Sequence, residues 1–114
     1  MDIKKLKSSL RRFAKDRDWN QFHTLKNIAC SISIESSELL ELFQWREIKG
    51  IDLKDPNLKV KISDEVADIF LYLIRFSDIA EINLEEVCLN KIKKNQKKYP
   101  ISLSKGNSKK YTEL

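Results

Sequence analysis

The chain has only two glycines and two prolines among its 114 residues. These residues supply most of the tight turns on which many-stranded sheets depend, so their scarcity favours a few long helices. The length suits one domain with a modest core of its own. One clear loop is expected in residues 49–57, which include Gly50, Asp52, Asp55 and Pro56. The sequence therefore predicts an all-α fold with one loop across its middle.

Apolar residues recur at helical spacing in four stretches. They cover residues 3–17, 22–45, 58–80 and 84–98. Asn20 and Asn83 are suited to cap the second and the last helix, and Pro100 ends the last one. We therefore expect a four-helix bundle in a domain of residues 1–100. Residues 101–114 are rich in Ser, Lys, Gly and Asn, and we expect them to form a flexible tail.

The net charge of +5 is unevenly distributed along the chain. Residues 91–110 hold eight lysines and no acid, whereas the other 94 residues carry 14 basic and 17 acidic side chains. The body is therefore mildly acidic, and the positive charge belongs to a C-terminal appendage. An interpretation as a nucleic-acid-binding protein would depend on that appendage alone, so we do not expect nucleic acid as a partner.

Cys30 and Cys88 are the only cysteines, and their separation fits no metal-binding motif. We expect both to be small buried side chains in a reducing compartment. No stretch resembles a signal peptide or is apolar for long enough to cross a membrane. The sequence predicts a cytoplasmic protein with no membrane partner.

Two pairs of acids, Glu35/Glu38 and Glu65/Asp68, stand within apolar stretches of the predicted helices. Each pair has i,i+3 spacing, so both of its carboxylates leave the same side of a helix. If the two helices pack together, the four acids converge, and a hard cation such as Mg²⁺ is the natural compensation. Mg²⁺ held in this way usually has a phosphate-bearing substrate as its other partner. From spacing alone, solvated helix faces are the more frequent explanation of such pairs.

The acidic pairs are accompanied by further blocks in a fixed order. The blocks are residues 16–23 (DRDWNQFH), 38–45 (ELLELFQW) and 64–69 (DEVADI), then Tyr72, Lys91, Asn95 and Tyr99-Pro100. Together they resemble the ExxE…ExxD signature of the MazG-like all-α nucleoside triphosphate pyrophosphohydrolases, in particular the dCTP pyrophosphatase branch. The resemblance covers residues 10–100. The chain departs from the branch at Leu25-Lys26, where Pro-Arg is usual, and at Ser36-Ser37, where a glycine-containing pair is usual.

The resemblance implies an enzyme that cleaves a nucleoside triphosphate between its α- and β-phosphates, giving the monophosphate and pyrophosphate. The implied substrate is dCTP or a related pyrimidine deoxynucleotide. Glu35, Glu38, Glu65 and Asp68 are implied to be both the catalytic residues and the Mg²⁺ ligands. Family members assemble into dimers or tetramers, so a homo-oligomer is implied here, with the tetramer favoured.

The resemblance also implies a set of substrate-binding residues. They are Trp19, His23, Lys26, Trp45, Tyr72, Lys91 and Asn95. The aromatic residues and His23 suit a nucleobase pocket, although aromatic residues on bundle helices are more often core. Lys91 and Asn95 share a helix face and are implied to reach the phosphates and the sugar, although a lysine among lysines is usually a solvated charge. Lys26 keeps a positive charge but lacks the bidentate fork of arginine.

Two other functional classes stay open at this point. The chain could be a non-catalytic helical regulatory or interaction module that keeps the fold, although the presence of all four acids argues against a site that has lost its activity. It could also bind nucleic acid through its basic tail. Glu41, one turn beyond Glu38, is expected to have a supporting or surface role.

Overall fold

The computed structural model describes all residues, 1–114, and contains helices but no strands. Its elements are α1 (Ile3–Asp16), α2 (Leu25–Glu41), η1 (Gly50–Lys54), α3 (Pro56–Ile79), α4 (Leu84–Lys98), α5 (Ile101–Ser104) and η2 (Tyr111–Glu113), of which η1 and η2 are 3₁₀ turns. The prediction of an all-α fold is confirmed. None of the helices is both long and apolar enough to span a membrane.

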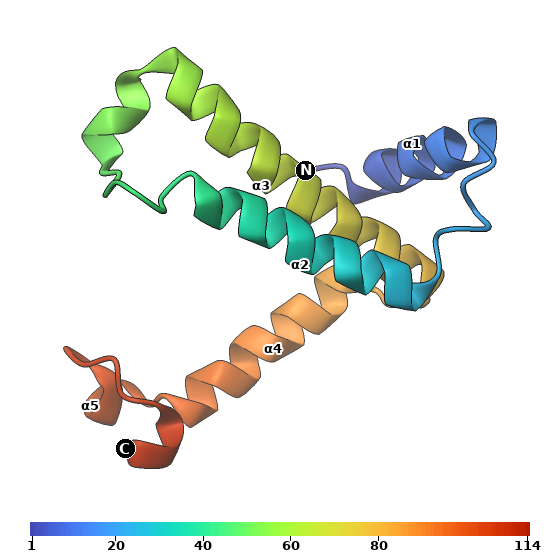
Figure 1. Ribbon diagram of the computed structural model, residues 1–114. Helices are drawn as coiled ribbons and strands as arrows, with labels where there is room; N and C mark the ends of the chain where they lie inside the picture. Colours follow the sequence, from blue (N-terminus) through green and yellow to red (C-terminus); the bar gives the residue numbers. More distant parts are fainter. The chain divides into compact units, whose positions relative to one another are not determined.

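The chain divides into two compact units, Met1–Glu81 and Ile82–Leu114. In the first unit α3 is the central helix, and both α1 and α2 pack against it. Figure 1 shows α2 and α3 running side by side, joined at one end by the loop that carries η1. This unit therefore packs three of the four predicted helices, and α4 belongs to the second unit.

Side-chain caps set where the helices begin. The Thr24 hydroxyl accepts a hydrogen bond from the Asn27 amide at 3.1 Å, so α2 begins at Leu25 and the prediction of Asn20 as its cap was wrong. Asp55 caps α3, with Pro56 in the first helical position, where its missing N–H costs nothing. Asn83 caps α4 as predicted, by accepting from the Glu86 amide.

The helix ends differ from the sequence prediction mainly in α2. This helix stops at Glu41, four residues before the predicted end, and residues 42–45 form turns. The break after the first helix is confirmed, because Asp18 adopts a left-handed φ of 55° that a continuing helix does not allow.

The second unit consists of α4 and the residues that follow it. Acids in the first turn of α4 and lysines in its last turn complement the helix dipole. Beyond Pro100 the structure gives two short helical turns, α5 and η2, where the sequence predicted none. The Tyr99 and Tyr111 rings meet edge to face at 6.1 Å, and Lys98 Nζ lies 4.7 Å from the centre of the Tyr111 ring. A flexible tail in residues 101–114 stays a prediction.

Few apolar side chains are fully buried. They are Ala14, Ile28 and Ile74, one from each helix of the first unit. Many large apolar residues are exposed instead, among them Phe22, Ile34, Leu40 and Val66 in the first unit. Both cysteines are also exposed, so the prediction that they are buried was wrong.

Candidate active site

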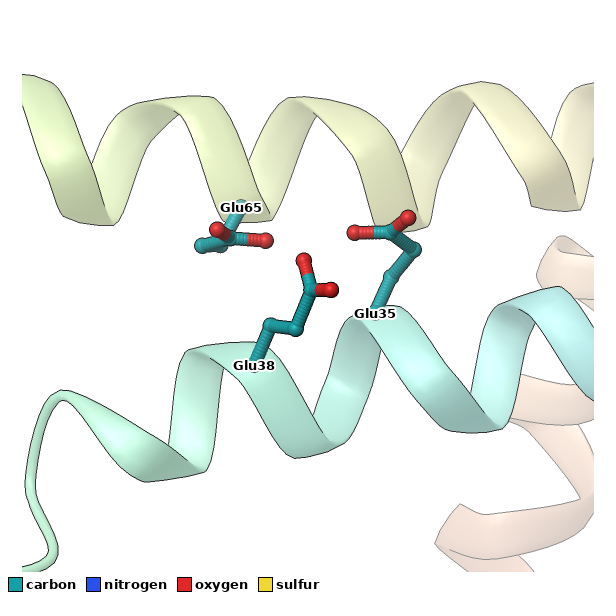
Figure 2. A group of neighbouring side chains, drawn as sticks. All are labelled: Glu35, Glu38 and Glu65. Atoms are coloured by element: carbon teal, nitrogen blue, oxygen red, sulfur yellow. The ribbon is translucent and has the colours of Figure 1, made fainter.

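Three of the predicted acids meet between α2 and α3. Glu35 and Glu38 leave α2, Glu65 leaves α3, and Figure 2 shows their carboxylates directed toward the same space. Each offers one oxygen that lies within 4.8 Å of the oxygens of the other two. The i,i+3 spacing on α2 and the packing of α2 along α3 are sufficient to bring them together. We refer to Glu35, Glu38 and Glu65 as the acidic cluster.

Asp68 lies close to this cluster without being part of it. It is one turn beyond Glu65 on α3 and is exposed, and it lines a cavity together with Glu35. Its charge is one of the influences that raise the pKa of Glu35. The sequence thus predicted four convergent acids, and the structure brings three together with the fourth beside them.

The acidic cluster is short of positive partners. Glu35 Oε2 and Glu65 Oε2 are buried without any hydrogen-bond partner. None of the ion pairs of the chain involves these acids, because the pairs are Arg11–Asp78, Arg12–Asp16 and Arg75–Asp78. Unpartnered buried carboxylate oxygens are costly, so the cluster suits a cation that would accept them as ligands.

The pKa values of the acidic cluster also reflect its lack of positive partners. The pKa of Glu35 is raised to about 7, mainly by partial burial. The neighbouring Glu38 carboxyl and the charges of Asp68 and Glu65 contribute to the same rise in pKa. Partial burial and Glu38 also raise the pKa of Glu65. Without a cation these carboxyls therefore hold protons more tightly than free carboxyls, and a bound cation would displace those protons.

A cavity of about 480 Å³ adjoins the acidic cluster, within the range of small-molecule sites. It lies within the first unit, and its lining comes from α1, the connection between α1 and α2, α2 itself and α3. The lining residues are Leu6, Ser9, Leu10, Phe13, Trp19, His23, Glu35, Asp68, Leu71, Tyr72 and Arg75. Most of this lining is apolar or aromatic, and the acids Glu35 and Asp68 are on the same lining. An apolar compartment thus directly adjoins the candidate metal ligands.

Three predicted base-pocket residues, Trp19, His23 and Tyr72, line this cavity. The Trp19 ring meets Phe13 edge to face at 5.6 Å and His23 at 6.2 Å. These contacts hold the aromatic side chains in defined orientations against α1. The cavity therefore offers flat, apolar surfaces beside carboxylates, which suits an aromatic ring bound next to a cation.

Comparison with known proteins agrees with this arrangement. A family model described as MazG-like matches residues 30–114. This chain belongs to the MazG-like family. It is 36% identical to bovine and 34% identical to human dCTP pyrophosphatase 1, in each case over 99% of this chain and 66% of theirs. The chain thus spans about two thirds of the length of these curated relatives.

A solved structure extends the comparison to the fold. A pyrophosphatase from Archaeoglobus fulgidus is 42% identical and superposes with a TM-score of 0.77, covering 85% of this chain and 91% of that one. The resemblance noted in the sequence is thereby confirmed, and the helices described above are a MazG-like fold.

Four predicted substrate-binding residues of this MazG-like chain lie outside the cavity. Lys26 is exposed in the first turn of α2. Trp45 is 90% exposed beyond the end of α2, where it belongs to the lining of a separate hollow formed by residues 43–48. Lys91 and Asn95 are exposed on α4, which belongs to the second unit. Contacts of these four residues with substrate stay predictions. Glu41 is exposed at the last position of α2, as expected of a surface residue.

Two contributors to the MazG-like cavity were not predicted from the sequence. One is α1, whose Leu6, Leu10 and Phe13 form a stripe that is equally typical of ordinary core. The other is Arg75, a charge within the apolar part of α3 and three residues after Tyr72. A charge in an apolar helical stretch was the signal that identified the acids, and it could have identified Arg75 too.

Proposed function

We propose that this MazG-like chain is a metal-dependent nucleoside triphosphate pyrophosphohydrolase. The single observation that carries the proposal is the acidic cluster, with buried, unpartnered oxygens on Glu35 and Glu65, adjoining an apolar cavity that Glu35 also lines. The similarity to bovine and human dCTP pyrophosphatase 1 and to the archaeal pyrophosphatase supports the same reaction class.

Mg²⁺ is the cation that we propose for the cluster. Hard carboxylate oxygens suit it, and it characteristically binds substrate phosphates through its remaining positions. Glu35, Glu38 and Glu65 would hold it, and Asp68 lies near enough to add its negative charge to the site. When bound, the cation neutralises phosphate charge and makes a coordinated water more acidic.

The reaction that we propose is the hydrolysis of the link between the α- and β-phosphates. A water oxygen forms a bond to the α-phosphorus, the bond from that phosphorus to the bridging oxygen breaks, and pyrophosphate leaves with the electron pair. The water proton passes to a carboxylate of the site. The role of this chain is to place the triphosphate beside the acids by holding the base in the adjoining cavity, so that the reacting atoms are already oriented.

The substrate that we propose is dCTP or a related pyrimidine deoxynucleotide. Trp19 and Tyr72 provide the aromatic surfaces for the base, and His23 provides a polar group. The names of the mammalian relatives support dCTP in particular. Lys26, Trp45, Lys91 and Asn95 are proposed as further contacts to the phosphates, sugar or base.

We also propose that the chain works as a homo-oligomer, a tetramer or a dimer. The support is its exposed apolar surface: Ile34, Leu40 and Val66 are each at least half exposed, while only three apolar residues are fully buried. An assembly that covered such residues would supply the burial that one chain lacks.

The test of this function is a panel of deoxynucleoside and nucleoside triphosphates incubated with Mg²⁺ or with EDTA. The expected products are the monophosphate and pyrophosphate in Mg²⁺, with dCTP among the best substrates and no turnover in EDTA. Formation of a diphosphate and free phosphate would contradict the proposed bond cleavage. No turnover of any nucleotide by the folded protein would favour the non-catalytic regulatory module instead.

A further inference from the structure

Arg75 is a buried cation on the lining of the cavity, with only 8% of its surface exposed. Its Nε donates to His23 Nδ1 at 3.1 Å, and one terminal nitrogen donates to Asn20 Oδ1 at 2.8 Å. The other terminal nitrogen lies 3.7 Å from Asp78 Oδ2. A single guanidinium thus ties α3 to the connection between α1 and α2, where His23 and Asn20 lie.

Asp78 fixes this guanidinium in turn. Its side chain is 8% exposed and receives two hydrogen bonds from Arg11 of α1, through Nε at 2.7 Å and a terminal nitrogen at 2.5 Å. The Arg11 hydrogen bonds hold the pKa of Asp78 below its usual range, so Asp78 stays an anion. A continuous chain of charges therefore runs from Arg11 through Asp78 to Arg75. It orients the guanidinium of Arg75 toward His23.

The contact with Arg75 determines which nitrogen of His23 carries the proton. A guanidinium only donates hydrogen bonds, so Nδ1 must supply a lone pair and the ring proton belongs on Nε2. Partial burial and the charge of Arg75 lower the pKa of His23, which keeps the ring neutral. No hydrogen bond from Nε2 to a protein group is present, and His23 lines the cavity, with its ring 6.2 Å from the ring of Trp19.

We propose that Arg75 is a positioning residue for base recognition, which locks His23 as the Nε2–H tautomer and so gives the cavity a fixed hydrogen-bond donor. The proposal rests on the proposed function, in which this cavity receives the base. Cytosine has a bare N3 beside its O2 and can accept from such a donor at both atoms. Uracil and thymine carry a proton on N3, so a locked Nε2–H can meet only their carbonyl oxygens, and the hydrogen bond to N3 is available to cytosine alone. Arg75 thereby favours cytosine, because it excludes the His23 tautomer with a bare Nε2, which would accept from the N3–H of uracil or thymine.

His23 is the only histidine of the chain, so its tautomer can be read without assignment by long-range ¹H–¹⁵N NMR. The expected spectrum shows one neutral form with the proton on Nε2. In Arg75→Met the expected spectrum shows exchange between both tautomers, because the apolar stem is kept and the donors are lost. A wild-type spectrum with Nδ1–H, or with both forms mixed, would overturn the proposal without reference to activity.

Base selectivity is the second measurement. In Arg75→Met the ratio of kcat/KM for dCTP over dUTP is expected to fall about tenfold, mostly through KM for dCTP. The matched control is Arg12→Met, because Arg12 is an exposed arginine that pairs only with Asp16 and does not line the cavity. Equal losses for both nucleotides in Arg75→Met, with an unchanged ratio, would make Arg75 a purely structural tie and overturn the proposal.

The failure of the proposed function would look different. If the wild-type protein hydrolysed no nucleotide, or Arg75→Met did not fold, binding of dCMP and dUMP to the wild-type chain would decide the matter by NMR. A shift of the His23 Nε2 resonance with dCMP, and a much smaller one with dUMP, supports the base contact. The absence of any shift with dCMP overturns it.

Discussion

Glu35 on α2 and Glu65 on α3 approach each other across the helix interface, and each has a buried Oε2 oxygen without a hydrogen-bond partner. Glu38 adds a third carboxylate within 4.8 Å. In the absence of a cation this arrangement is unfavourable, because like charges repel and burial penalises each of them. The stability of the first unit and its affinity for a cation are therefore linked.

Glu65→Gln is expected to have opposite effects with and without metal. In EDTA the variant melts at a higher temperature than the wild type, because one of the repelling charges is removed. In Mg²⁺ the wild type is stabilised and the variant is not, because a ligand is lost. Thermal melts in both conditions test this, with Glu41→Gln as the exposed control on α2 that changes neither curve. Equal stabilisation of wild type and Glu65→Gln by Mg²⁺ would place the metal elsewhere.

The metal-free protein is expected to lose stability as the pH rises from about 4.5 to about 7. The pKa of Glu35 is raised from 4.5 to about 7, so in this window the folded state holds a proton that the unfolded state has released. Saturating Mg²⁺ favours the ionised carboxylates and is expected to remove the decline. Melting temperatures across this window, with and without Mg²⁺, measure both effects. A metal-free stability that rises over the same interval would contradict the account.

Ser9→Trp is expected to raise KM for the nucleotide about tenfold while leaving the Mg²⁺ affinity unchanged. Ser9 lines the cavity, so an indole there would fill space that the base requires, whereas the acidic cluster lies between α2 and α3. Ser8→Trp is the matched control, since Ser8 is also an exposed serine of α1 but does not line the cavity. Steady-state kinetics of the two variants compare them directly. An equal rise in KM for both would show that the cavity does not receive the base.

Replacing the tail lysines Lys105, Lys109 and Lys110 with glutamine is expected to leave kcat/KM unchanged within about twofold. These side chains are exposed, and none of them lines the cavity. Salt-dependent binding to nucleic acid, if the wild type has any, is expected to weaken in the variant. A large loss of hydrolysis would show that the tail takes part in the reaction.

The acids and the long helices could be predicted from the sequence because they depend on local spacing. Glu35 and Glu38 share a helix face whatever packs against it, and the apolar period of α3 is visible without a partner. Helix ends were less predictable: Thr24 caps α2 where Asn20 was expected, because a cap is decided by one hydrogen bond.

The cavity could not be predicted from local spacing, because it exists only where α1 packs beside α3. The Leu6, Leu10 and Phe13 stripe predicts an apolar contact but not the gap that remains beside it. Arg75 is part of no recognisable motif. Its role depends on hydrogen bonds to His23 and Asn20, which are more than fifty positions away in the sequence. Such long-range polar contacts are set by tertiary packing.

Whether the acidic cluster is the catalytic metal site is tested by pyrophosphate release from dCTP in Mg²⁺ by the wild type, Glu38→Gln and Glu41→Gln. Both variants change one exposed carboxylate of α2 to the same amide, but only Glu38 belongs to the acidic cluster. We expect metal-dependent release by the wild type, little change in Glu41→Gln, and a loss of about 100-fold or more in Glu38→Gln. Wild-type rates in Glu38→Gln would contradict the claim that the cluster is the catalytic metal site.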